Sequence, residues 1–92
     1  MHPRRAYRWN TPFGRWIAEV GVQAITTNLA RHPELAVCPG AVYQWIKGAA
    51  SPSYERSKAL VELSGGELTI DMIRDHRRVV REIQSANQRQ NR

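Results

Sequence analysis

A short segment of the chain carries the side chains best suited to chemical recognition. Between Cys38 and Gly48, apolar residues recur at helical spacing, and the polar residues between them share the opposite side of the predicted helix. That outward set is Gly40, Tyr43, Gln44 and Lys47. The amide of Gln44 both donates and accepts, so it can pair bidentately with the edge of an adenine. Lys47 offers a point charge suited to phosphate, and Tyr43 can reach a phosphate or a thymine methyl. The alternative interpretation is that Tyr43 and Gln44 are simply exposed polar positions.

The other side of this predicted helix is apolar. It consists of Val42, Trp45 and Ile46, which recur at the spacing of a core-facing stripe. Trp45 could stack on a nucleobase, but a large aromatic residue between two aliphatic ones most often packs inward, so we expect it in the core. We expect Cys38, at the start of the helix, to be a weak cap rather than a redox residue.

Basic residues are concentrated near the start of the chain. Arg4, Arg5 and Arg8 have almost no acidic neighbour, a distribution typical of segments that follow phosphates or enter a narrow minor groove. A solvated basic tail is an equally good interpretation. Arg15, on the first predicted helix, is a further candidate for contact with a phosphate backbone.

Size and composition restrict the kind of protein to which such residues could belong. The 92 residues fill one small domain, and 14 Lys and Arg against 8 acidic residues give a formal charge of +6, which favours an anionic partner. A single cysteine excludes an intrachain disulfide and a multi-thiolate metal cluster. No run approaches the roughly 20 apolar residues of a membrane span. We find no catalytic motif, and we expect no cofactor, no metal, no small-molecule substrate and a cytoplasmic location.

Turn residues divide the chain into five segments whose apolar residues recur every three or four positions, which predicts an all-α fold. We expect Thr11 to cap the first helix, Ser51 to cap the fourth with Pro52 as its first residue, and Thr69 to cap the fifth. The inward residues expected on the first, second and fourth helices are Phe13, Trp16, Ile17 and Val20, then Val22, Ile25, Leu29 and Ala30, then Tyr54, Ala59, Leu60 and Leu63. The fifth helix is expected to end near Ser85, before a frayed tail.

Two successive short helices, the second with a polar outer face, followed by a helix beneath them, form a helix-turn-helix arrangement. The stretch from Ile17 to Asp75 resembles the DNA-binding domain of phage Cro-type repressors, and more closely that of the YdaS-type Cro-like family. The resemblance rests on the pieces EVGVQAI, VCPGAVYQWIKG, ASPSYERSKALVELSGGELT and IDMI. It implies a compact lambda-repressor/Cro-like domain of about five helices with an extended C-terminal helix. Between Arg31 and Pro39 the chain is a few residues longer than the tight turn of the family, so the resemblance leaves the angle between the second and third helices open.

The expected organisation is a basic arm over residues 1–10, the helix-turn-helix domain over 11–68, and a C-terminal helix with a frayed basic tail over 69–92. An apolar stripe runs along the last helix through Ile73, His76, Val80 and Ile83. Since a helix-turn-helix module that occupies one half-site binds weakly, we expect these residues to form a homodimer. The alternative is that the stripe covers its own domain.

These features predict a small sequence-specific transcriptional regulator that binds double-stranded DNA, a phage or prophage repressor acting at an operator in the nucleoid of a bacterial cell. A protein-interaction module, such as an antitoxin or an inhibitor of a polymerase, is the alternative from another class. RNA binding is a weaker third interpretation, because the sequence does not clearly provide exposed aromatic platforms.

Overall fold

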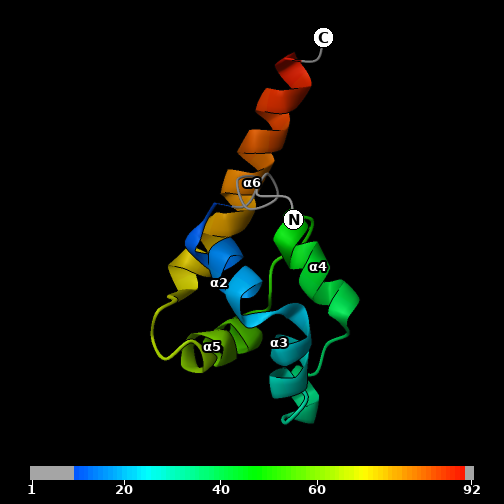
Figure 1. The fold of residues 1–92 in the computed structure, drawn as a ribbon, viewed down its shortest axis with the longest axis vertical. Helices are drawn as coiled ribbons and strands as arrows, with labels where there is room; N and C mark the ends of the chain where they lie inside the picture. Colours follow the sequence, from blue (N-terminus) through cyan, green and yellow to red (C-terminus); the bar gives the residue numbers. More distant parts are fainter. Residues whose placement is uncertain (1–9, 91–92) are drawn as a thin grey trace.

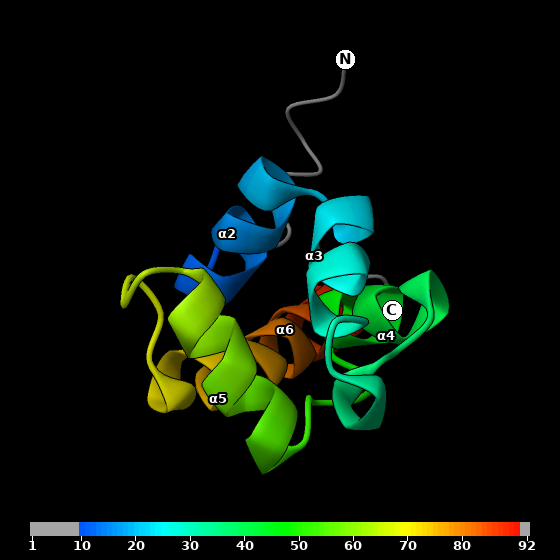
Figure 2. The ribbon, with the colours of Figure 1, turned by 90° about the horizontal axis from the view of Figure 1, so that it is seen from below.

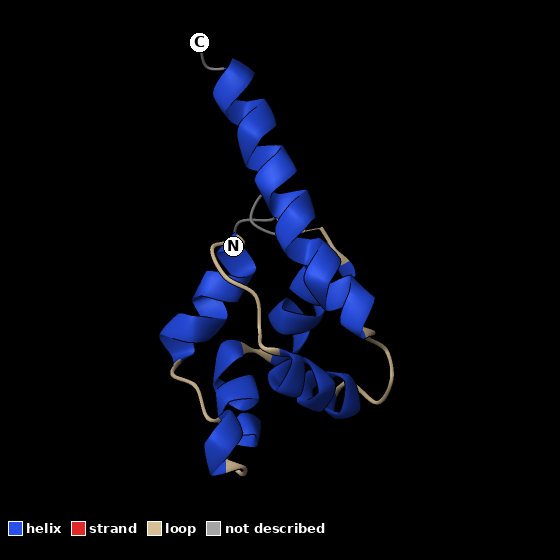
Figure 3. Cartoon of the chain, turned by 180° about the vertical axis from the view of Figure 1, so that it is seen from behind, coloured by secondary structure: helices blue, strands red, loops and turns tan. Residues whose placement is uncertain are grey.

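Helices account for all the regular structure in residues 10–90, the part of the chain that the computed structural model describes. The order is α2 (Pro12–Val20), α3 (Val22–Leu29), the short 3-10 helix η1 (Pro33–Leu35), α4 (Pro39–Lys47), α5 (Tyr54–Leu63) and α6 (Ile70–Gln90) (Figure 1). No strand occurs among these residues, as Figure 3 also shows. The predicted all-α domain of five helices with an extended last helix is confirmed.

Two helices begin where the capping chemistry of the sequence predicts. The Thr11 hydroxyl accepts a hydrogen bond from the Gly14 amide at 2.9 Å at the start of α2. The Thr69 hydroxyl accepts one from the Met72 amide at 3.1 Å at the start of α6. Each bond satisfies an amide that has no partner within the helix, which explains why a threonine in this position specifies a helix start.

The predicted start of α5 is wrong by two residues. Ser53 is the cap in place of Ser51, and its Oγ accepts a hydrogen bond from the Arg56 amide at 3.2 Å, while Pro52 precedes the helix. A start at Ser53 places Glu55 in the first turn, where the helix dipole favours a negative charge. The loop after α4 places Ser51 against α6, outside the helix.

The core is built from the apolar stripes of the five helices and from Leu68, which lies in the loop just before α6. Its buried members are Phe13, Trp16, Ile17, Ile25, Leu29, Val42, Trp45, Leu60, Leu68, Ile73 and Val80. Four residues that we expected to face inward, Val20, Ala30, Tyr54 and Leu63, are exposed. Each stands at or next to a helix end, where the stripe extends past the neighbouring element that covers its middle. Periodicity therefore predicts which face of a helix is buried, but not how far along the helix the burial continues.

Helix α6 is the central element of the fold. Seen from below, α2, α4 and α5 lie around it, and α3 packs on α2, α4 and α5 (Figure 2). The C-terminal part of α6 projects beyond the other helices (Figures 1 and 3). It continues to Gln90 rather than ending near Ser85, because its Gln, Arg and Ala residues favour helix even without apolar contacts. Among residues 10–90, none of the helices has the length and apolar character needed to cross a membrane.

Candidate nucleic-acid interface

Helix α4 presents to solvent the outward set predicted from the sequence. All four of its members are exposed, namely Gly40, Tyr43, Gln44 and Lys47. The opposite side is buried through Val42 and Trp45, so Trp45 belongs to the core and not to a stacking platform. An α-helix with its side chains is about 10–12 Å in diameter, and the B-DNA major groove is about 12 Å wide. The exposed face therefore has the dimensions needed to enter such a groove.

The first turn of α4 has few side-chain donors. Cys38 occupies the N-cap position with extended backbone, but its side chain makes no capping hydrogen bond, so the weak cap that we expected is not formed. Pro39 is the first helical residue and has no backbone N–H, and Gly40 has no side chain. The first side chains along this helix that can donate or accept a strong hydrogen bond are therefore those of Tyr43 and Gln44, one turn further along.

The C-terminal end of α4 is fastened to α6 by two hydrogen bonds and a close backbone contact. The Nε2 of His76 lies 3.0 Å from the Ile46 carbonyl oxygen, and the Nε of Arg77 donates to the Gly48 carbonyl at 3.2 Å. Gly48 has left-handed backbone with φ 76°, and a Cβ added there would lie 2.9 Å from Cγ1 of Val80. The exposed face of α4 is thus carried on a rigid junction.

His76 joins three helices through one chain of hydrogen bonds. A carbonyl can only accept, so Nε2 donates to Ile46 in α4, and Nδ1 of the neutral ring accepts from the Thr11 hydroxyl at 2.6 Å. Thr11 in turn accepts from the amide of Gly14 in α2. Burial lowers the pKa of His76 below its ordinary value, although the hydrogen bonds with the backbone of Ile46 and Trp45 raise it. A neutral ring in the core fits all of these partners.

The long turn between α3 and α4 is an ordered element. Residues Pro33–Leu35 form η1, and the guanidinium of Arg56 in α5 holds the residues that follow. Its Nε donates to the Leu35 carbonyl at 2.9 Å and its Nη2 to the Ala36 carbonyl at 3.2 Å. These bonds fix the direction in which the chain enters α4. Sequence reasoning missed Arg56, because nothing within the turn itself indicates a partner 20 residues away.

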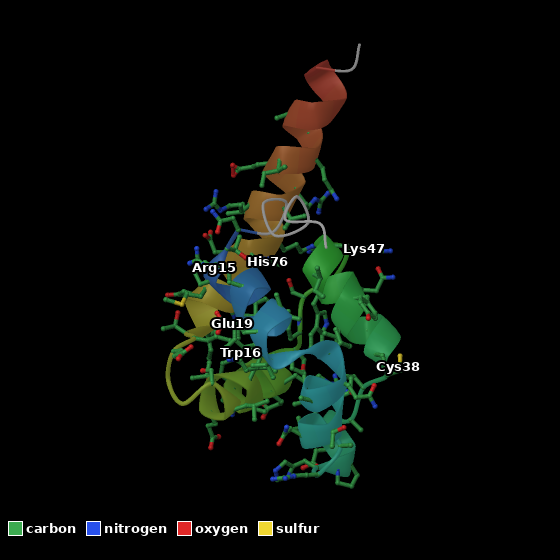
Figure 4. The ribbon with its side chains drawn as sticks, viewed as in Figure 1. Arg15, Trp16, Glu19, Cys38, Lys47 and His76 are labelled. Carbon is green, nitrogen blue, oxygen red and sulfur yellow. The ribbon has the colours of Figure 1, made fainter. Side chains whose placement is uncertain are left out.

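Of the basic residues predicted elsewhere, Arg15 is the one that the structure describes, and it does not lie beside α4. Arg15 donates from Nη1 to Asn10 Oδ1 at 2.9 Å, and Figure 4 places it on the far side of His76 from Lys47. Arg15 and the exposed face of α4 therefore lie on different sides of the molecule. The candidate arm residues Arg4, Arg5 and Arg8 lie outside the described residues, and their role stays a prediction.

The predicted dimerisation stripe requires correction. Ile73, His76 and Val80 are buried in the core of their own domain, so they are not available to a partner chain in this fold. The alternative interpretation, that the stripe covers its own domain, applies to these three residues. Ile83, one turn further along, is partly exposed on the projecting part of α6. The reason is geometric: the stripe meets α2, α4 and α5 before it leaves the domain.

Comparison of the chain with family models, with curated proteins and with solved structures finds no match. The case for a function therefore rests on the geometry of α4 and its supports.

Proposed function

We propose that this chain is a sequence-specific DNA-binding transcriptional regulator, a Cro-like repressor of phage or prophage type that occupies an operator with α4 in the major groove. The observation that carries the proposal is the exposed face of Tyr43, Gln44 and Lys47 on a helix whose C-terminal end is hydrogen-bonded to α6. Rigid placement matters because base recognition requires side chains held in register with the groove.

The residues of this face are proposed to contact different parts of the DNA. Gln44 is the candidate for a bidentate contact with adenine, and Lys47 and Tyr43 are candidates for the phosphates that border the groove. The formal charge of +6 favours approach to DNA in general. A bound repressor of this kind would act in the nucleoid of its host cell by excluding polymerase from a promoter.

Two binding measurements, made one after the other, test the proposal. A fluorescent random-sequence duplex is titrated at low salt, and duplexes recovered by repeated selection from random DNA are then titrated in the same buffer. We expect measurable binding to the random duplex and an affinity for the selected site that is higher by about 10³ or more. A selection that yields no shared sequence would contradict sequence-specific recognition, and a random duplex that does not bind would contradict DNA binding altogether.

A protein-interaction module is the second candidate, and the projecting part of α6 favours it. A helix that leaves its domain with Ile83 partly exposed offers a surface that another protein could cover. Such a module, an antitoxin or an inhibitor of a polymerase, need have little affinity for duplex DNA. The random-duplex titration therefore separates the two functions.

A further inference from the structure

Four arginines share one face of α6. They stand at relative positions 0, 3, 4 and 7 of the helix, namely Arg74, Arg77, Arg78 and Arg81, and all are exposed. Together with Ser51, Glu82 and Ser85 they line an open hollow of about 750 Å³ between α6 and the loop after α4. We call the four residues the arginine face.

The charge of this face is only partly neutralised by its neighbours. Arg78 is paired with Asp75 and with Glu82, both on α6. Within the part of the chain that the structure describes, Arg74, Arg77 and Arg81 form no ion pair. Like charges three and four positions apart on a helix repel each other, so this arrangement costs helix stability in the absence of a bound anion.

The arginine face adjoins the C-terminal end of α4. Arg77 donates from Nε to the carbonyl of Gly48, the residue that directly follows Lys47. Ser51, on the rim of the hollow, belongs to the same loop. The arginine face therefore meets the C-terminal end of α4 at Arg77 and extends along α6 on both sides of this junction, over about 10 Å from Arg74 to Arg81.

We infer that the arginine face of α6 binds the phosphates of duplex DNA beside the groove that α4 enters, so that α6 is a second backbone-binding element. The inference rests on the proposed function and extends it to residues outside α4. Guanidinium groups hold phosphate oxygens bidentately, and an open hollow admits a continuous backbone that passes along the helix. The contact of Arg77 with the residue that follows Lys47 favours DNA over an acidic protein segment, since it places the arginine face next to the helix that is proposed to enter the groove.

The salt dependence of binding measures these contacts. Each neutralised phosphate adds about 0.9 to the slope of the logarithm of the association constant against the logarithm of salt concentration. We expect Arg81→Ala to lower the slope by about 0.9 and the double variant Arg74→Ala/Arg81→Ala to lower it by about 1.8, measured with a labelled random-sequence duplex. Arg77 is left intact because it also supports α4. The exposed Lys58 of α5 provides the control, and Lys58→Ala should leave the slope unchanged.

The outcomes separate this inference from the function on which it rests. If the wild-type chain binds the duplex and the double variant keeps the wild-type slope, the arginine face does not contact phosphates, and the proposed function stands without it. If the wild-type chain does not bind the duplex at low salt, the proposed function and the inference both fail. Circular dichroism should give both variants a melting temperature no lower than that of the wild type, because the substituted side chains are exposed and their removal relieves repulsion on α6. A variant that is partly unfolded at the temperature of the titration would assign the drop in slope to misfolding and overturn the inference.

Discussion

Gln44 and Lys47 stand on the same exposed face of α4 but can contribute to binding in different ways. An amide that pairs with one base edge discriminates among sequences, whereas an ammonium beside a phosphate attracts every sequence alike. We expect Gln44→Ala to weaken the selected duplex by about 1–3 kcal/mol and to relax preference at one position, with little effect on random duplex. Lys47→Ala should weaken both duplexes to a similar degree. Equal losses on both duplexes for Gln44→Ala would contradict its role in base recognition.

The buried ring of His76 makes stability depend on pH in a defined direction. Because burial lowers its folded pKa, the unfolded chain takes up a proton at a higher pH than the folded chain does. The contribution of the neutral ring is fully present above about pH 6.5 and decreases as the pH falls from there towards the lower folded pKa. Urea unfolding from pH 8 to pH 5 should show this decrease, at most about 1.4 kcal/mol per pH unit for one proton.

A pair of variants isolates the contribution of this ring. His76→Leu loses the hydrogen bonds with Thr11 and Ile46 and is expected to be less stable at every pH, but with a flatter dependence on pH between 8 and 5. His32→Gln, which changes an exposed ring in the turn, should keep the wild-type dependence. An unchanged dependence in His76→Leu would assign the effect to other groups.

At the scale of the element, the junction between α4 and α6 depends on Gly48. Gly48 and Gly65 both have left-handed backbone, with φ of 76° and 69°, but a Cβ at Gly48 would meet Val80 whereas one at Gly65 would meet open space. We expect Gly65→Ala to cost about 1–2 kcal/mol from backbone strain and Gly48→Ala about 2–4 kcal/mol, since crowding of the core is added. Urea unfolding of the two variants measures the difference. Equal costs would show that Val80 moves aside without penalty.

The elements themselves could be predicted from the sequence because their signals are local. Thr11 and Thr69 cap helices through amides three residues away, and the apolar stripes repeat within each helix. The supports of α4 could not be predicted, because they join residues far apart in the chain. Arg56 donates to the carbonyls of Leu35 and Ala36, which lie 21 and 20 residues earlier in the chain. Arg77 donates to the carbonyl of Gly48, 29 residues earlier. No periodic pattern contains such information.

At the scale of the whole molecule, the exposed side of α4 was predictable, while the availability of the last helix to a partner was not. Tyr43, Gln44 and Lys47 are polar residues on a two-faced helix, and the polarity itself indicates the exposed side. An apolar stripe, in contrast, can pack on its own domain or on a second chain with the same sequence pattern. In this fold Ile73 and Val80 are buried in the core of their own domain. The apolar surface that remains on the projecting part of α6 is small.

This burial changes what we expect of the homodimer. Stable interfaces bury more than about 1,000 Å², which the partly exposed Val79 and Ile83 do not supply, so two copies should pair when bound to adjacent half-sites rather than free in solution. Sedimentation of the chain at micromolar concentration should show a monomer, and a selected duplex with two half-sites should bind two copies cooperatively. Ile83→Gln should reduce the cooperativity and leave the affinity for a single half-site unchanged. A stable dimer in the absence of DNA would contradict this expectation.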